Sequence, residues 1–180
     1  VAKPADVAGF NPDLFVYAGA GDAETLDPSK AYDTASSEII FQCYDNLLAY
    51  KPGSLTEFIP MLATEVPTVE NGLISPDGLT YTFPIRKGVK FHNGAILTPE
   101  DVEYSFERNM LADPVGGPMW MLLEPLLGVG TIEAYACNLA GVDDFSKVDE
   151  KNLIKTAQAV MNAVEVKGDN VVFHLAQPYP

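Results

Sequence analysis

The 180-residue chain carries 11 Lys and Arg against 25 Asp and Glu, a net charge of −14, and 47% of its residues are apolar. This is the composition of a globular protein. The acidic balance argues against a nucleic-acid partner or an anionic membrane surface, since both need a basic face. The length fits one domain, or one domain and part of another.

The first elements are a strand and a helix separated by a loop. The apolar run 14–18 (LFVYA) predicts a buried strand, and a loop rich in Gly, Asp and Pro follows it. From Ile39 to Leu48 the apolar residues recur on one helical face, which predicts a helix from about Thr34 to about Ala49. Pro52-Gly53 then breaks the chain.

The central part shows the clearest periodicity. The sequence 75–78 (SPDG) is typical of a type I turn, and alternating apolar residues then predict a half-buried strand over 79–85. Pro84 has no N–H to donate, so this strand is expected at a sheet edge or at a bulge. A further turn is expected at Asn93-Gly94.

A helix is predicted to begin at Thr98-Pro99. Thr98 can accept the first free N–H groups, and proline suits the first helical position. The spacing of Val102, Phe106 and Met110 gives this helix one apolar stripe.

The last third is predicted to contain a helix and a hairpin. The stretch 119–127 fits either a short helix or a packed loop. Residues 153–161 form a second apolar helical face, and 164–175 read as a hairpin with its turn at 167–170. Together these elements predict a mixed α/β chain.

The residues alone predict no catalytic, metal or cofactor site, and hence no enzyme. A nucleotide loop at 19–21 would need a third glycine where the anionic Glu24 stands. The acidic residues of 143–150 do not have the spacing of a calcium loop. The two histidines and two cysteines are isolated in sequence, and a long-range disulfide stays open. Trp120, the single tryptophan, fits a core role and a ligand-stacking role equally.

A long central motif adds a resemblance to a known family. Residues 71–110 (NGLISPDGLTYTFPIRKGVKFHNGAILTPEDVEYSFERNM) closely resemble the family 5 extracellular solute-binding proteins, the oligopeptide, dipeptide and nickel-type receptors of ABC importers. The sequence departs from the family pattern at Asn93 and Pro99. The flanking segments 26–28 (LDP), 44–48 (YDNLL), 60–65 (PMLATE) and 164–180 are also similar to family elements.

The resemblance implies the N-terminal part of lobe I of a class II periplasmic-binding-protein-like fold, with a mixed sheet and with the second lobe absent. Residues 1–50 would be the first strand and helix of lobe I. Residues 51–175 would be an inserted α/β subdomain, and 176–180 the start of the return to lobe I. The motif residues themselves, Arg86 and His92 among them, would serve the structure of that subdomain.

The resemblance also implies a function. The protein would bind peptides between two lobes that close on a hinge, and pass them to the membrane permease subunits of an ABC importer. The ligand contacts would be Gly21, Asp22, Ala23 and, from the subdomain, Trp120. The location would be periplasmic or extracellular, with a lipid anchor as an option and the signal peptide already removed. The alternatives are a nickel or oligosaccharide receptor, or a sensor that uses the same fold to bind a partner protein.

Overall fold

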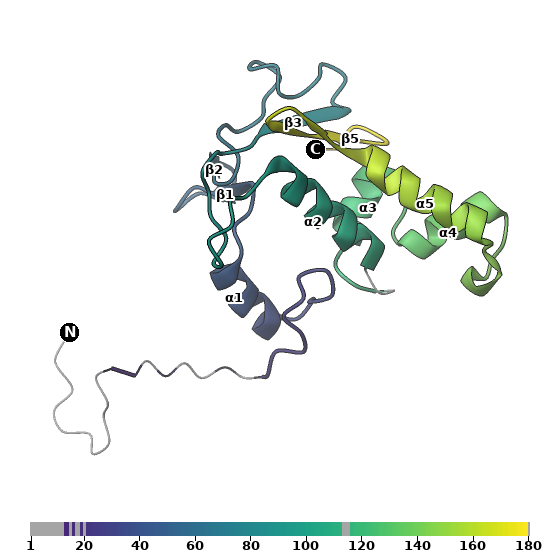
Figure 1. Cartoon of the computed structure of the whole chain (residues 1–180), viewed down its shortest axis with the longest axis horizontal. Coiled ribbons are helices and arrows are strands. Elements are labelled where there is room, and N and C mark those ends of the chain that lie inside the picture. The colour runs from purple at the N-terminus through teal and green to yellow at the C-terminus, as the bar shows by residue number, and fades with distance from the viewer. Residues whose placement is uncertain (1–12, 15, 17–18, 20, 113–115, 180) are drawn as a thin grey trace.

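The computed structural model describes residues 13, 14, 16, 19, 21–112 and 116–179. Figure 1 shows a small sheet with helix α2 (Pro99–Ala112) against it. Helix α1 (Thr34–Cys43) lies at one end of the molecule, and α4 (Ile132–Ala140) and α5 (Glu150–Ala163) form an arm at the other end. The predicted strand 14–18 lies mostly outside the described residues, and the two apolar side chains described there, Leu14 and Val16, are exposed.

The main sheet has the order β3-β5-β4 and is antiparallel. Strands β4 (Val164–Lys167) and β5 (Asn170–His174) form the predicted hairpin, and β3 (Thr80–Pro84) pairs with the other side of β5. Strand β3 therefore lies at an edge, as the missing N–H of Pro84 predicts. The expected 75–78 turn precedes it, with the Gly78 N–H donating to the Ser75 carbonyl at 2.8 Å.

The second sheet joins β1 (Leu48–Tyr50) to β2 (Phe58–Pro60), again antiparallel. All strand pairs among the described residues are antiparallel, so the mixed sheet of the expected fold class is not present in this part of the chain. Short connections join β1 to β2 and β4 to β5, and these permit only antiparallel pairing, whereas β3 and β5 pair antiparallel although helices α2 to α5 lie between them in the chain.

Helix α1 is shorter than predicted. It ends at Cys43, because Tyr44 takes an extended conformation (φ −119°, ψ 141°) and the chain then enters β1. The prediction of a helix to about Ala49 is therefore wrong. The helical spacing of apolar residues continues as far as Leu48, but Leu48 and Ala49 pair with β2. This pairing overrides the local helical pattern. Much of the predicted apolar face, including Ile39 and Tyr44, is exposed.

Helix α2 begins where the sequence predicts, but its cap works differently. The Asp101 carboxylate accepts hydrogen bonds from both the backbone N–H and the hydroxyl of Thr98, at 2.8 and 3.1 Å. The Thr98 side chain thus donates to the first turn instead of accepting from it, and the bond from the Thr98 N–H to Asp101 is half of a capping box. The stripe of Val102, Phe106 and Met110 packs into the core as expected.

The ambiguous stretch 119–127 contains helix α3 (Trp120–Leu127), which ends at Gly128. Helix α4 was not predicted, although Thr131 caps its first turn (Ala134 N–H to Thr131 Oγ1, 3.1 Å) and Gly141 ends it. A short 3₁₀ turn, η1 (Phe145–Lys147), follows. Helix α5 is found where predicted, but only part of its apolar face is covered: Val160 is buried, whereas Ile154 and Met161 are exposed.

The core lies between the main sheet and helices α2, α3 and α5. Phe173 of β5 meets Phe83 and Phe106 edge-to-face, with ring centroids 5.4 and 4.7 Å apart. The contact of Phe106 with Phe173 joins α2 to the sheet. Cys43 and Cys137 are both free. Within the described part of the chain, every helix is too short or too polar to cross a membrane.

Candidate functional site

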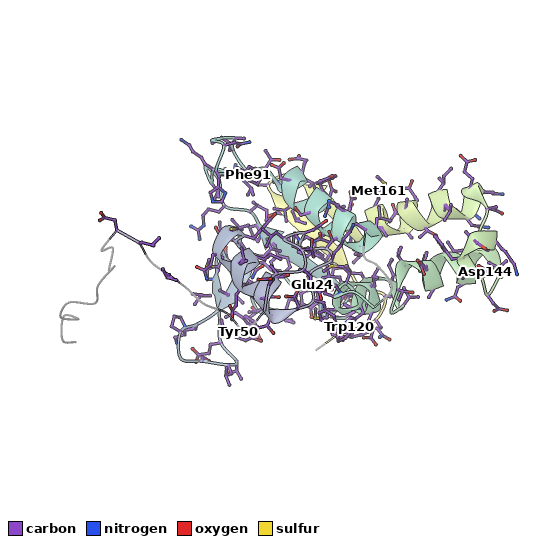
Figure 2. All side chains as sticks on the ribbon, turned by 90° about the horizontal axis from the view of Figure 1, so that it is seen from below. Glu24, Tyr50, Phe91, Trp120, Asp144 and Met161 are labelled. Carbon is purple, nitrogen blue, oxygen red and sulfur yellow. The ribbon has the colours of Figure 1, made fainter. Side chains whose placement is uncertain are left out.

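The loop that precedes α1 runs beside the C-terminal half of α2 and the start of α3. It contains the predicted ligand residues Gly21, Asp22 and Ala23. Gly21 and Asp22 are exposed and Ala23 is half-buried. In the view of Figure 2, Glu24 of this loop lies on the side of Trp120, far from Asp144 at the outer end of the α4–α5 arm.

An ion pair fixes the loop on α2. The Arg108 guanidinium donates from Nη1 to Asp27 Oδ1 at 2.9 Å and from Nη2 to Asp27 Oδ2 at 2.7 Å. Such a two-pronged pair is stronger and more directional than a single charged hydrogen bond. The side chains of Arg108 and Asp27 are only 40% and 25% exposed, so water weakens the pair less than it would on an open surface.

Ser29 completes this contact. Its hydroxyl donates to Asp27 Oδ1 at 2.6 Å and accepts from Arg108, and its backbone N–H donates to the same Asp27 oxygen at 3.1 Å. Ser29 is fully buried. The Arg108 guanidinium first, and then the Ser29 hydroxyl, hold the pKa of Asp27 far below its ordinary value. The carboxylate is therefore ionised at any physiological pH.

A second contact ties the same loop to α3. The indole Nε1–H of Trp120 donates to the hydroxyl of Tyr32 at 3.1 Å. Trp120 is the first residue of α3, and 38% of its surface is exposed. Tyr32 belongs to the loop and is itself exposed. The structure thus brings Trp120 to Tyr32, which lies in the same loop as the other predicted ligand residues and nine positions after Ala23.

Arg86 has the structural role that the resemblance implies. Its Nε donates to the Met61 carbonyl at 3.0 Å, and the Arg86 N–H donates to the Leu62 carbonyl at 2.8 Å. These bonds hold the 60–65 segment along the edge of the sheet. His92 lies in the exposed turn that ends at Gly94.

Sequence reasoning missed Asp27, Ser29, Tyr32 and Arg108 as parts of this arrangement. Asp27 and Arg108 both belong to the quoted family motifs, and Arg108 is one of only two arginines in the chain. Two features of the sequence could have pointed to them. Arg108 is a cation on the polar side of an amphipathic helix, and Asp27 belongs to the LDP motif at 26–28. No local pattern pairs them, because 81 residues separate them.

A separate apolar hollow of about 270 Å³ opens beside the core. Its walls come mainly from β3, β5, α2 and α3, and include Leu47, Tyr81, Phe83, Phe106, Leu126 and Leu175. The described residues of its lining include no charged side chain that could pair with a polar solute. Among the described residues there is also no group of three or more His, Cys, Asp or Glu side chains that could hold a metal ion.

Comparisons with known proteins agree with the motif resemblance. The family model of bacterial extracellular solute-binding proteins, family 5 (middle part), matches residues 57–180. The Dipeptide-binding protein of Escherichia coli is 37% identical over 106 residues, which are 56% of this chain and 16% of that protein. Heme-binding protein A of Haemophilus influenzae is 35% identical over 108 residues, 57% of this chain and 16% of that protein.

Solved structures extend the likeness to the fold. The pheromone receptor PrgZ, solved to show its mode of peptide binding, matches with a TM-score of 0.60 at 22% identity, over 89% of this chain and 27% of that one. The chain therefore has the α/β fold of one part of the larger periplasmic binding proteins. It spans only about 16% of the length of the curated relatives. Because the family model matches more than half of its residues, the chain belongs to the bacterial extracellular solute-binding proteins of family 5, which are binding proteins and not enzymes.

Proposed function

We propose that the protein is the receptor of an ABC importer that binds peptides outside the cytoplasm. The observation that carries this proposal is the family match over residues 57–180, together with the dipeptide-binding relative at 37% identity. The ligand would lie between two lobes that close on a hinge, and membrane permease subunits would then receive it. Residues 1–50 and 176–180 would belong to lobe I itself, and 51–175 to its inserted subdomain.

The loop and Trp120 suit a peptide ligand. Asp22 is exposed and can pair with a ligand ammonium group, and the adjacent backbone of Gly21 and Ala23 would bond an extended peptide as a strand does. The half-exposed ring of Trp120 offers a flat apolar face for a side chain of the peptide. Tyr32 lies ten residues after Asp22 in the same loop, and its hydroxyl accepts from the Trp120 indole, which supports the proposal that both segments serve one site.

Calorimetric titration tests this proposal on the protein at the family's full length, with di- to pentapeptides as ligands. We expect saturable binding of peptides. Asp22→Asn should weaken it about tenfold, the loss expected for one charge-assisted bond worth about 1.4 kcal/mol. Trp120→Ala should weaken binding by a similar factor.

Asp143→Asn is the matched control, because it removes the same charge from an exposed position next to Asp144, at the outer end of the arm. It should leave the affinity unchanged. Equal affinities for Asp22→Asn and Asp143→Asn would remove Asp22 from the site. Heme belongs in the same titration because one relative is a heme-binding protein. Binding of heme and of no peptide would replace the proposed ligand class.

A further inference from the structure

The loop before α1 is tied to two different helices by two separate polar contacts, Asp27–Arg108 on α2 and Tyr32–Trp120 on α3. We propose that Arg108 is a positioning residue of the ligand site. It sets where the loop lies, and through Tyr32 it sets the orientation of the Trp120 ring. This inference rests on the proposed function for the ligand, but its geometric part stands by itself.

The first step is that Asp27 governs the conformation of its neighbours. The Asp27 N–H donates to Thr25 Oγ1 at 3.2 Å, and the Asp27 carbonyl accepts from the N–H groups of Lys30 and Ala31, both at 3.0 Å. Thr25 in turn donates its N–H to the hydroxyl of Ser36, in the first turn of α1. The part of the loop from Thr25 to Ala31 is thus a braced unit centred on Asp27.

The second step is that apolar packing does little to hold this unit. The side chains of Leu26 and Tyr32 are exposed, and α1 has few contacts with the other helices and strands. The buried residues Ser29 and Ala31 are small. The ion pair with Arg108 is therefore the main long-range restraint on the loop among the described contacts.

The third step is that Arg108 lies apart from the core. The core face of α2 consists of Val102, Phe106 and Met110. A residue two positions from Phe106 and two from Met110 points to the opposite side of a helix. Removal of the guanidinium therefore frees the loop and leaves the packing of α2 on the sheet in place.

The last step connects the loop to Trp120. As the first residue of α3, Trp120 has no preceding helical turn to restrict its rotamer. Its ring orientation depends on the Nε1–H bond to Tyr32, the neighbour of Ala31 in the braced loop. Loss of the Arg108 contact should therefore reach the indole ring without any contact between Arg108 and Trp120.

The 180-residue chain allows a direct test, because Trp120 is its single tryptophan. The measurement is the emission maximum and acrylamide quenching of Trp120 in the wild type and in four variants: Arg108→Ala, Arg108→Lys, Tyr32→Phe and Lys87→Ala. Lys87→Ala is the matched control, since it removes a cation from an exposed ion pair with Asp169, between the turn after β3 and the turn that joins β4 to β5. Circular dichroism checks that each variant is folded.

We expect a red shift and steeper quenching for Arg108→Ala, and the same change for Tyr32→Phe. Arg108→Lys should show a smaller change, because an ammonium group keeps the charge but cannot form two parallel bonds to the carboxylate. Lys87→Ala should match the wild type. If Arg108→Ala does not fold, Arg108→Lys and Tyr32→Phe decide the outcome. Wild-type emission from a folded Arg108 variant, beside altered emission from Tyr32→Phe, would overturn the inference.

The effect on ligand binding is measured with the protein at the family's full length and a peptide that the wild type binds. Arg108→Ala should weaken the binding of that peptide about tenfold, equivalent to about 1.4 kcal/mol, and Lys87→Ala should have no effect on its affinity. Unaltered affinity in Arg108→Ala would show that the loop position does not matter to the ligand, and would overturn the inference. A wild type that binds no peptide would instead refute the proposed function, while the fluorescence arm would still decide whether Arg108 positions the ring.

Discussion

The carboxylate of Asp27 and the guanidinium of Arg108 form a two-pronged ion pair across 81 residues of sequence. The pair joins the first segment of the chain, which carries the candidate ligand loop, to helix α2, which packs on the main sheet. A contact of this kind couples two parts of the fold that share little apolar surface. Four predictions on folding and stability follow from the contacts of the structure.

A double-mutant cycle should measure the coupling of Asp27 and Arg108. Its two members are partly exposed, so the coupling should lie between that of a surface pair and that of a buried one, at about 1–2 kcal/mol. Urea unfolding of the chain with Asp27→Ala, Arg108→Ala and both together gives this value. The Lys87–Asp169 pair is a suitable reference, because both of its side chains are largely exposed, and it should couple by less than about 0.5 kcal/mol. Equal coupling in the two cycles would contradict the account.

The stability that Asp27 contributes should depend on pH in one direction. Its pKa in the folded chain is lowered from 3.8, so the folded state favours the ionised form. That contribution is complete above the unfolded pKa of 3.8 and is lost as the pH falls below it. The difference in unfolding free energy between wild type and Asp27→Asn should stay constant from about pH 7 to about pH 5 and then shrink. A difference that already shrinks near pH 6 would point to another group.

Truncation of a core residue of α2 should lower the free energy of unfolding much more than truncation of the exposed residue next to it. Met110 is 0% exposed, and Met110→Ala should lower the free energy of unfolding by about 2–5 kcal/mol through the lost contacts and the cavity left behind. Leu111 is 43% exposed, and Leu111→Ala should change it by about 0.5 kcal/mol or less. Chemical denaturation of both variants makes the comparison. Similar losses at the two positions would show that α2 is rotated from the orientation described.

Gly128 should resist substitution because of its backbone conformation. It ends α3 at φ +70°, and its N–H donates to the Glu124 carbonyl at 3.0 Å. An added Cβ would only touch Ala176 at 4.0 Å, so the cost of Gly128→Ala comes from the left-handed conformation and should be about 1 kcal/mol. Gly130 has neither a positive φ nor a close neighbour, and Gly130→Ala should not destabilise the chain. Thermal unfolding of the two variants would contradict this account if both had the same midpoint.

The elements predicted correctly are those with strong local signals. The 75–78 turn, strand β3, the β4–β5 hairpin and helix α2 each combine a clear period with turn or cap residues that agree with it. Helix α1 shows the limit of this reasoning. Its apolar period runs on past Cys43, but pairing with β2 takes Leu48 into a strand, and no local pattern contains that information.

The candidate site was less accessible to sequence reasoning than the fold. Trp120 could be singled out as a lone aromatic residue, but its partner Tyr32 is 88 residues away. Arg108 and Asp27 are likewise joined only by the tertiary structure. Helix α4 differs from these contacts, because it could have been predicted locally. Thr131 and Gly141 are start and stop signals for a helix at this place.

The central claim is that the protein binds peptides, and a thermal-shift panel on the protein at the family's full length tests it most directly. The panel contains di- to pentapeptides, nickel chelates, oligosaccharides and heme. A ligand present at 100 times its dissociation constant adds about 2.7 kcal/mol to the free energy of unfolding, which raises the melting temperature measurably. The account predicts a rise with peptides and with no other class. A rise only with sugars, nickel chelates or heme, or no rise with any of the four, would contradict it.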